Sequence, residues 1–256
     1  MTHIPPAPQL DWAWFFDIDG TLASIEMSPD AVRVDGVMQY LIEVLHEKTH
    51  GAVALVSGRS LRDIDKLFPN FTLAAAGQHG AERRHANGIV ARQPVPSAQL
   101  LAMRDALREM ERRHAGLMLE DKGLSLSMHY RQVPRLGAFV QREVRALFMQ
   151  MGSGFHIQLG KCVVEIVPTG HSKGSVITEF LAEAPFSSRV PAFLGDDVTD
   201  ENAFAVVNAL GGISIKVGAG PTLAPYRLSD VPAVRDWLAS LSSLTVLNHS
   251  EAGDAA

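Results

Sequence analysis

Cysteine is almost absent from this chain: its 256 residues include one, Cys162. A single cysteine excludes an intrachain disulfide and fits a reducing compartment. Basic residues do not dominate either, since 23 Lys and Arg stand against 28 Asp and Glu, for a net charge of −5. Proteins that bind nucleic acid usually carry a basic footprint. We therefore expect no nucleic-acid partner.

Long apolar runs are missing as well. None approaches the roughly 18 residues that a membrane span requires. The N-terminal stretch MTHIPPAPQLD lacks the basic and apolar regions of a secretory signal. Hydrophobic content of 46% and charged content of 20% are ordinary for a globular chain. We expect a soluble, cytoplasmic monomer with no membrane contact.

Apolar strands alternate with helical stretches in the first and last thirds of the chain. Residues 36–49 predict an amphipathic helix with Val37, Leu41, Val44 and Leu45 on one face. Strands are predicted at AWFFDI, AVALVSG, FTLAAAG, AFLGDD and GISIKVG. This alternation predicts an α/β fold of the Rossmann-like type, with a parallel sheet and helices on both faces.

The middle of the chain follows a different pattern. Residues 94–168 give the order αββαββ, which predicts a small antiparallel sheet with helices on one face. We therefore expect a catalytic core formed by residues 1–93 and 169–256. The inserted α+β segment 94–168 would act as a cap domain for substrate recognition.

The stretch HEKTH at residues 46–50 matches the H-E-x-x-H pattern of zinc sites. His46 and His50 would share one face of a helix. That face lies opposite the apolar stripe, and Gly51 ends the helix at once. A catalytic zinc site needs an enclosed face and a third ligand, so we interpret the stretch as a solvated polar face.

Residues 170–174, GHSKG, fit the G-x-S-x-G nucleophile elbow, which follows a strand and opens a helix. A later aspartate and His249 would complete the required order. However, His249 lies in a polar tail, and no oxyanion segment precedes Ser172. We favour Ser172 as the N-cap of the helix that follows.

A third set of residues is distributed along the chain, and each member lies where a predicted strand ends or the next helix begins. In open α/β sheets this edge binds ligands. Carboxylates gathered there would raise one another's pKa values, and an all-oxygen site of this kind suits Mg²⁺. Hydroxyl, backbone N–H and ammonium groups at helix N-termini bind phosphate. The set comprises Asp17, Asp19 and Thr21, then Ser57, Gly58 and Arg59, then Lys173, and finally residues 195–201, which include Asp196, Asp197 and Asp200.

The segments DIDGT, SGR, the lysine of HSKG and GDDVTDE resemble the four motifs of the haloacid dehalogenase (HAD) superfamily of phosphotransferases. The resemblance implies that Asp17 attacks phosphorus and forms an aspartyl-phosphate. It implies that Asp19 protonates the leaving alcohol and then activates water. Ser57 and Lys173 would hold the transferring phosphoryl group. A carboxylate is a competent nucleophile, and lysine and metal stabilise the transferring charge.

The same resemblance implies a ligand set for Mg²⁺. Asp17, the backbone carbonyl of Asp19 and the carboxylate of Asp196 would bind the ion. Asp197 and Asp200 would support it.

The inserted segment carries acids and bases on its predicted strands, which suits a polyhydroxylated ligand. GQHGAE, the strand series from Glu120 to Arg131, and the series from Lys161 to Glu165 resemble the trehalose-6-phosphate phosphatase family, from about residue 14 to 237. This implies a small-molecule substrate, trehalose 6-phosphate. The expected substrate-binding residues are Gly58, Arg59, Glu120, Lys122, Arg131, Lys161 and Glu165.

One family loop departs from its usual form, so Gln78 and His79 receive no role. Two alternatives stay open. A HAD phosphatase for another sugar phosphate would keep the core motifs and change the cap face. A non-catalytic, Mg²⁺-dependent phospho-acceptor module would use Asp17 and leave Asp19 without a role.

Overall fold

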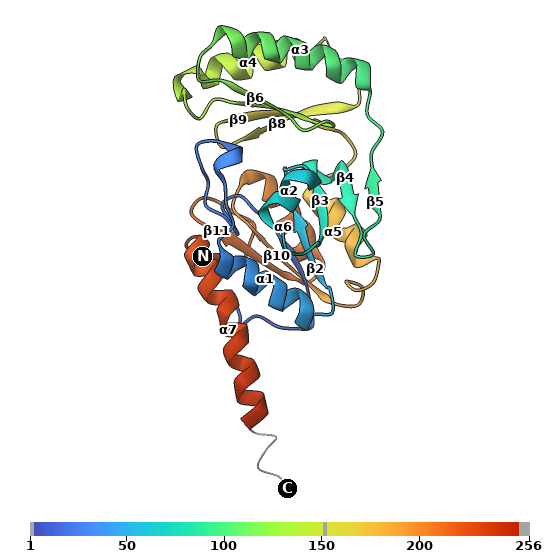
Figure 1. Cartoon of the computed structure of the whole chain (residues 1–256), viewed down its shortest axis with the longest axis vertical. Helices are drawn as coiled ribbons and strands as arrows, with labels where there is room; N and C mark the ends of the chain where they lie inside the picture. Colours follow the sequence, from blue (N-terminus) through green and yellow to red (C-terminus); the bar gives the residue numbers. More distant parts are fainter. Residues whose placement is uncertain (1–2, 151–152, 251–256) are drawn as a thin grey trace.

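The computed structural model describes residues 3–150 and 153–250, arranged around two sheets. Figure 1 shows the larger sheet in the centre of the molecule and the smaller one above it. The chain enters the smaller unit through the segment before residue 97 and returns from it after residue 168. None of the helices in the described ranges combines the length and apolar character needed to cross a bilayer.

The larger sheet has eight strands in the order β12-β11-β10-β1-β2-β3-β4-β5. The strands are β1 Trp12–Phe16, β2 Val53–Val56, β3 Ala74–Gly77, β4 Glu82–Arg84, β5 Val90–Arg92, β10 Val190–Gly195, β11 Ile213–Val217 and β12 Tyr226–Leu228. All neighbours from β12 to β3 pair in parallel. At one edge, β4 and β5 add an antiparallel hairpin that the sequence pattern did not predict.

Helices cover both faces of this sheet, as predicted. They are α1 Gly36–Lys48, α2 Leu61–Leu67, α5 Lys173–Leu181, α6 Glu201–Ala209 and α7 Val231–Ser250, with 3₁₀ turns at Pro29–Ala31, Gln78–Gly80 and Val198–Asp200. Side chains alternate along β1. Trp14 and Phe16 therefore pack with α1, α2 and α7, while Phe15 packs with α5 and α6. The strand is buried on both faces, which explains its continuous apolar run.

The buried face of α1 differs from the prediction. Val37 is 57% exposed, and Met38 and Ile42 are buried beside Leu41 and Leu45. Residues at i, i+3, i+4 and i+7 share a helix face. Two such sets overlap in this stretch, and contact with the sheet and α7 selects the one that begins at Met38.

The smaller sheet is antiparallel, in the order β6-β7-β9-β8. Its elements are α3 Ser97–Arg113, β6 Met118–Asp121, β7 Leu126–His129, the 3₁₀ turn Pro134–Leu136, α4 Gly137–Phe148, β8 Phe155–Gly160 and β9 Val163–Pro168. The predicted αββαββ order is confirmed. α3 and α4 pack on the face away from the larger sheet (Figure 1), over Leu126, Met128, Val164 and Ile166. The opposite face of the strands lies toward the larger sheet.

Candidate active site

Three neighbouring strands each end one residue before a predicted site residue. β1, β2 and β10 lie side by side and end at Phe16, Val56 and Gly195. Asp17, Ser57 and Asp196 come directly after these ends and are 5%, 1% and 6% exposed. The parallel sheet therefore brings residues that are up to 179 positions apart to one edge, where α/β proteins bind ligands.

Asp17 lies in a buried network of opposite charges. The Lys173 ammonium is 2.8 Å from Asp17 Oδ1 and 2.7 Å from Asp200 Oδ1. Burial raises the pKa of Asp17 well above its ordinary value; Lys173 opposes this shift, and Asp200 and Asp196 add to it. Burial works against the charge of Lys173, but its two carboxylate partners raise its pKa. The first turn of α5 thus places a firmly charged cation beside Asp17.

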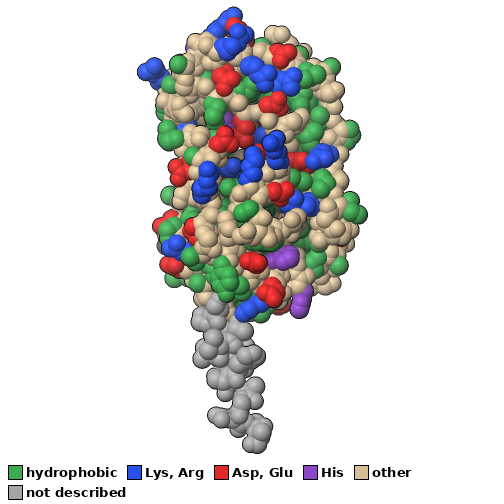
Figure 2. Space-filling model, in the orientation of Figure 1, with side chains coloured by type: hydrophobic (Ala, Val, Ile, Leu, Met, Phe, Trp, Pro, Cys, Tyr) green, Lys and Arg blue, Asp and Glu red, His purple; other side chains and the backbone are tan. Residues whose placement is uncertain are grey.

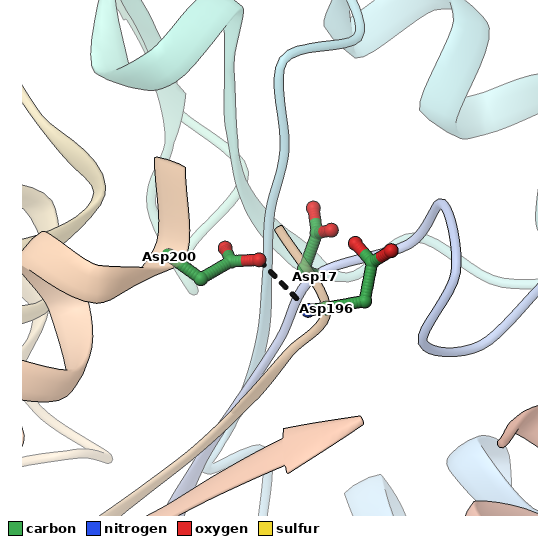
Figure 3. A group of neighbouring side chains, drawn as sticks. All are labelled: Asp17, Asp196 and Asp200. Atoms are coloured by element: carbon green, nitrogen blue, oxygen red, sulfur yellow. Dashed lines mark hydrogen bonds between the residues drawn. The ribbon is translucent and has the colours of Figure 1, made fainter. Parts of the chain in front are cut away.

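The Asp200 carboxylate holds the loop after β10 in place through hydrogen bonds to its backbone. Its Oδ2 accepts hydrogen bonds of 2.9 Å from the backbone N–H groups of Asp196 and Asp197. Figure 3 shows the carboxylates of Asp17 and Asp196 directed to one side, while that of Asp200 turns to the Asp196 backbone. With Oδ1 bonded to Lys173, the fully buried Asp200 orients the other groups.

The donor chemistry of this edge fits Mg²⁺. Carboxylate oxygens of Asp17, Asp196 and Asp200 lie within 4.8 Å of one another, the single such group among the described residues. Oxygen ligands of this kind are those that Mg²⁺ prefers. Both oxygens of Asp200 are already engaged, by Lys173 and by backbone N–H groups, so Asp17 and Asp196 are the members of this group that are better placed to hold an ion. Asp197 caps the following turn through Val198 N–H.

The remaining carboxylates are paired with cations that lie far away in sequence. Arg59 Nε and Nη2 donate to the two oxygens of Asp19, each at 2.7 Å. Lys161, in the turn between β8 and β9, donates to Asp196 Oδ2 at 2.6 Å. Sequence proximity gave no sign of these ion pairs. We expected Arg59 and Lys161 to bind substrate. In this structure, they contact the carboxylates of Asp19 and Asp196 at the sheet edge.

One pocket joins the sheet edge to the small unit. Its walls include Asp17, Asp19, Asp196 and Asp197 on one side, and polar side chains of the small unit on the other. All seven predicted substrate residues line it: Gly58, Arg59, Glu120, Lys122, Arg131, Lys161 and Glu165. Figure 2 shows charged side chains of both signs gathered on the visible face at the level where the two units meet. Ser57 and Lys173 lie buried behind the pocket edge.

The far wall of the pocket is a row of paired polar residues. Register places Glu120 opposite Ser127, Ser127 opposite Glu165, and Glu165 opposite Gln158 across the four strands. The Lys122 ammonium is 2.8 Å from Glu165 Oε1. Burial alone would raise the pKa of Glu165, but Lys122 and His79 hold it well below its usual range. The wall thus presents ionised acceptors and cationic donors to the cavity.

Sequence reasoning missed two contributions to the site. Gln78 and His79 are buried between the units and bond to the small sheet. The loop before α1 also lines the pocket through Glu26, Met27 and Pro29. In the sequence, only the departure of GQHGAE from the usual family loop pointed to one of these contributions, that of Gln78 and His79. No sequence feature pointed to the loop before α1.

The two rejected motifs have structural explanations. α1 ends at Lys48, so His50 lies beyond the helix, exposed and with φ 56°, and does not share a helix face with His46. Ser172 is the N-cap of α5, as predicted: its Oγ accepts from Ser175 N–H at 3.1 Å and donates to Asn202 at 2.7 Å. Ser172 therefore serves as a helix cap, and the His249 side chain, which the serine-nucleophile hypothesis needed, lies outside the described residues.

Comparison with known proteins agrees with this geometry. Residues 15–232 match the family model for trehalose-phosphatase. A trehalose-6-phosphate phosphatase of Escherichia coli is 44% identical over 243 residues, which cover 93% of this chain and 89% of the relative. The chain belongs to the trehalose-phosphatase family. The match spans the aspartates of the sheet edge as well as the whole inserted unit.

Solved structures of low sequence identity show the fold. The C-terminal domain of a Candida albicans trehalose-6-phosphate phosphatase has a TM-score of 0.81 at 21% identity, over 90% of this chain and 92% of that one. A HAD-superfamily phosphatase from Bacteroides thetaiotaomicron has a TM-score of 0.59 at 15% identity, over 91% and 95%. The expected α/β core, with an α+β unit inserted into it, is confirmed.

Proposed function

We propose that this chain is a Mg²⁺-dependent phosphatase that hydrolyses trehalose 6-phosphate to trehalose and phosphate, as in trehalose biosynthesis. The observation that carries the proposal is one pocket with a carboxylate edge on one wall and a polar strand face on the other. The first wall suits a phosphoryl group, and the second suits sugar hydroxyls, each of which donates and accepts hydrogen bonds. Membership of the trehalose-phosphatase family supports the choice of sugar.

In the first half-reaction, an oxygen of Asp17 attacks phosphorus, and the bond between phosphorus and the sugar oxygen breaks. Asp19 gives its proton to that oxygen, so trehalose leaves as a neutral alcohol. Ser57 and Lys173 hold the oxygens of the transferring group, and positioning and charge stabilisation supply most of the catalysis in phosphoryl transfer. The short Lys173–Asp17 distance, 2.8 Å, supports this arrangement.

In the second half-reaction, Asp19 takes a proton from water, and the water oxygen attacks the phosphorus of the aspartyl-phosphate. The bond to Asp17 breaks and inorganic phosphate leaves. Asp17, Asp196 and the Asp19 carbonyl would hold Mg²⁺, with Asp197 and Asp200 in support; when bound, the ion compensates the negative charge of the carboxylates and the phosphoryl group.

We propose further that residues 94–168 act as the cap and residues 1–93 and 169–256 as the catalytic core. Glu120, Lys122, Arg131 and Glu165 lie on the cap side of the pocket. A cap over the leaving group excludes water from the first half-reaction. The monomeric state and the cytoplasmic location stay predictions from the sequence.

Phosphate release from a panel of sugar phosphates, with and without Mg²⁺, tests the proposal. Trehalose 6-phosphate should give the highest kcat/KM. Preference for a different sugar phosphate would support the alternative phosphatase with the same core and a different specificity. Stoichiometric labelling of Asp17 without turnover of any substrate would support the phospho-acceptor module.

A further inference from the structure

Two consecutive buried residues lie at the junction of the two units in an uncommon backbone conformation. Gln78 has φ 49° and His79 has φ 58°, and they are 1% and 7% exposed. Positive φ is rare for residues other than glycine. Such conformations persist where the surrounding structure holds them, and they cluster at functional sites. The pair directly follows β3, on the same edge as Asp17 and Ser57.

His79 contacts the two strands that form one side of the cap sheet. Its Nε2 is 3.1 Å from Glu165 Oε2 on β9. A carboxylate can only accept, so in the neutral imidazole Nε2 carries the proton. The Gln158 amide nitrogen on β8 lies 3.2 Å from Nδ1 and 3.1 Å from Nε2, and Nδ1 is then the ring nitrogen that can accept from it. His79 therefore orients a carboxylate that faces the pocket.

Gln78 contacts the opposite side of the cap sheet. Its Oε1 accepts from Ser125 Oγ at 2.8 Å and from Leu124 N–H at 3.2 Å, both in the turn between β6 and β7. Its Nε2 donates to Glu82 Oε1 at 3.0 Å, and Glu82 is anchored to α2 through Leu61 N–H at 2.7 Å. The side chain thus joins the cap to a fixed point of the core.

Gly58 makes room for these contacts. A Cβ built on Gly58 would lie 2.7 Å from His79 Nε2, so a side chain there would displace the ring. The carbonyl of Gly58 accepts a 2.9 Å hydrogen bond from Lys122, which also bonds to Glu165. Gly58 is therefore packed in one cluster with the His79 ring and with the cap residues Lys122 and Glu165.

We propose that Gln78 and His79 are positioning residues that hold the cap in the closed arrangement over the phosphoryl site, His79 by orienting Glu165 and Gln78 by fixing the β6–β7 turn. The role rests on the proposed phosphatase function. It predicts a difference in kcat/KM between two kinds of substrate. A substrate with a sugar for the cap to bind needs the pair, whereas p-nitrophenyl phosphate has no sugar and needs only the core edge.

The test is His79→Asn. Asparagine tolerates positive φ, but its shorter side chain does not reach Glu165. Loss of one hydrogen bond to a charged group should lower kcat/KM for trehalose 6-phosphate by about 10- to 100-fold, mainly through KM, because the closed cap contacts ground state and transition state alike. The value for p-nitrophenyl phosphate should change less than about threefold on the same reasoning. His79→Gln, which keeps an N–H donor, should restore most of the loss.

The matched control is His50→Asn. His50 also has positive φ, is exposed, and lies at the end of α1 far from the cap, so this variant should match the wild type on both substrates. A double-mutant cycle gives the second readout: with Glu165→Gln already present, His79→Asn should cost much less than it does alone.

Equal losses on both substrates, or additive effects in the cycle, would overturn the positioning role. A wild-type enzyme inactive on trehalose 6-phosphate would contradict the proposed function alone. The same comparison would then be made with the sugar phosphate that the enzyme does hydrolyse, so the two failures remain distinguishable.

Discussion

The guanidinium of Arg59 binds the carboxylate of Asp19 through two hydrogen bonds of 2.7 Å each. Arg59 is 8% exposed and also contacts the Pro29 carbonyl, so the pair is fixed at the pocket wall. A planar fork of this kind fixes the orientation of a carboxylate in a way that a lysine does not. Arg59 therefore fixes the position of the Asp19 carboxylate, the proposed general acid and base.

Arg59→Lys should keep a positive charge but lose the fork. General acid–base assistance is worth about 10²–10⁴-fold, and part of it, about tenfold or more, should disappear from kcat/KM for trehalose 6-phosphate. p-Nitrophenolate leaves without a proton, so phosphorylation by p-nitrophenyl phosphate should be less affected. Arg62→Lys, at an exposed position in the first turn of α2, is the control. An equal effect on the two leaving groups would contradict this role.

Gly20 lies against the Asp196 carboxylate. Its φ is +81°, and a Cβ there would lie 2.1 Å from Asp196 Oδ2. Gly20→Ala should therefore displace Asp196 and raise the Mg²⁺ concentration for half-maximal activity by about 10- to 100-fold, the usual effect of disturbing the support of a metal ligand. Gly88→Ala is a strain-matched control, since Gly88 has φ +85° and no atom near its Cβ position. Equal Mg²⁺ requirements in the two variants would refute the prediction.

Removal of metal should abolish turnover without unfolding the protein. Lys173 and Lys161 already pair with Asp17 and Asp196 at 2.8 and 2.6 Å, so the carboxylates keep partners in the absence of the ion. Treatment with EDTA should eliminate phosphate release, leave the circular dichroism spectrum unchanged, and be reversed by excess Mg²⁺. Full activity after exhaustive chelation would contradict the proposed metal dependence.

The cap residues should discriminate between substrates. Glu165→Ala should lower activity on trehalose 6-phosphate far more than on p-nitrophenyl phosphate, because a site built to bond hydroxyls penalises their absence. Lys161→Ala should lower activity on both substrates, because Lys161 also pairs with Asp196 at 2.6 Å. Glu165→Ala should also lower the free energy of unfolding by about 3–5 kcal/mol, since it leaves Lys122 buried without a main partner. Asp105→Ala, an exposed acid on α3, should change neither quantity. Equal losses of Glu165→Ala on both substrates would show that Glu165 only holds the cap together.

The sheet edge could be predicted from sequence because local pattern determines it. Asp17, Ser57 and Asp196 each follow a short apolar run, and the ends of parallel strands must meet at one edge. The same logic predicted a parallel sheet with helices on both faces. The sequence could not predict which side chain would neutralise each carboxylate. The partners Arg59, Lys161 and Lys173 come from segments that are distant in the sequence.

The contacts at the junction of the two units could not be predicted from local sequence patterns. The contacts of Gln78 and His79 with the cap span 46 to 86 positions, and they depend on positive φ values that the residue types in GQHG do not predict. The β4–β5 hairpin was missed for a related reason: strands of three residues are too short to show a period of two. In α1, two apolar stripes overlapped, and only packing against the sheet decided that Val37 is exposed.

Covalent labelling by p-nitrophenyl phosphate tests the central claim, that Asp17 is the nucleophile and Asp19 its acid and base. In Asp19→Asn, the backbone carbonyl can still bind Mg²⁺, but the side chain no longer activates water, so an initial burst of p-nitrophenolate should precede slow turnover. Mass spectrometry of the trapped protein should place the phosphate on Asp17. Asp17→Asn should show no burst with any substrate. A phosphate found on another residue, or a normal burst in the Asp17 variant, would contradict the account.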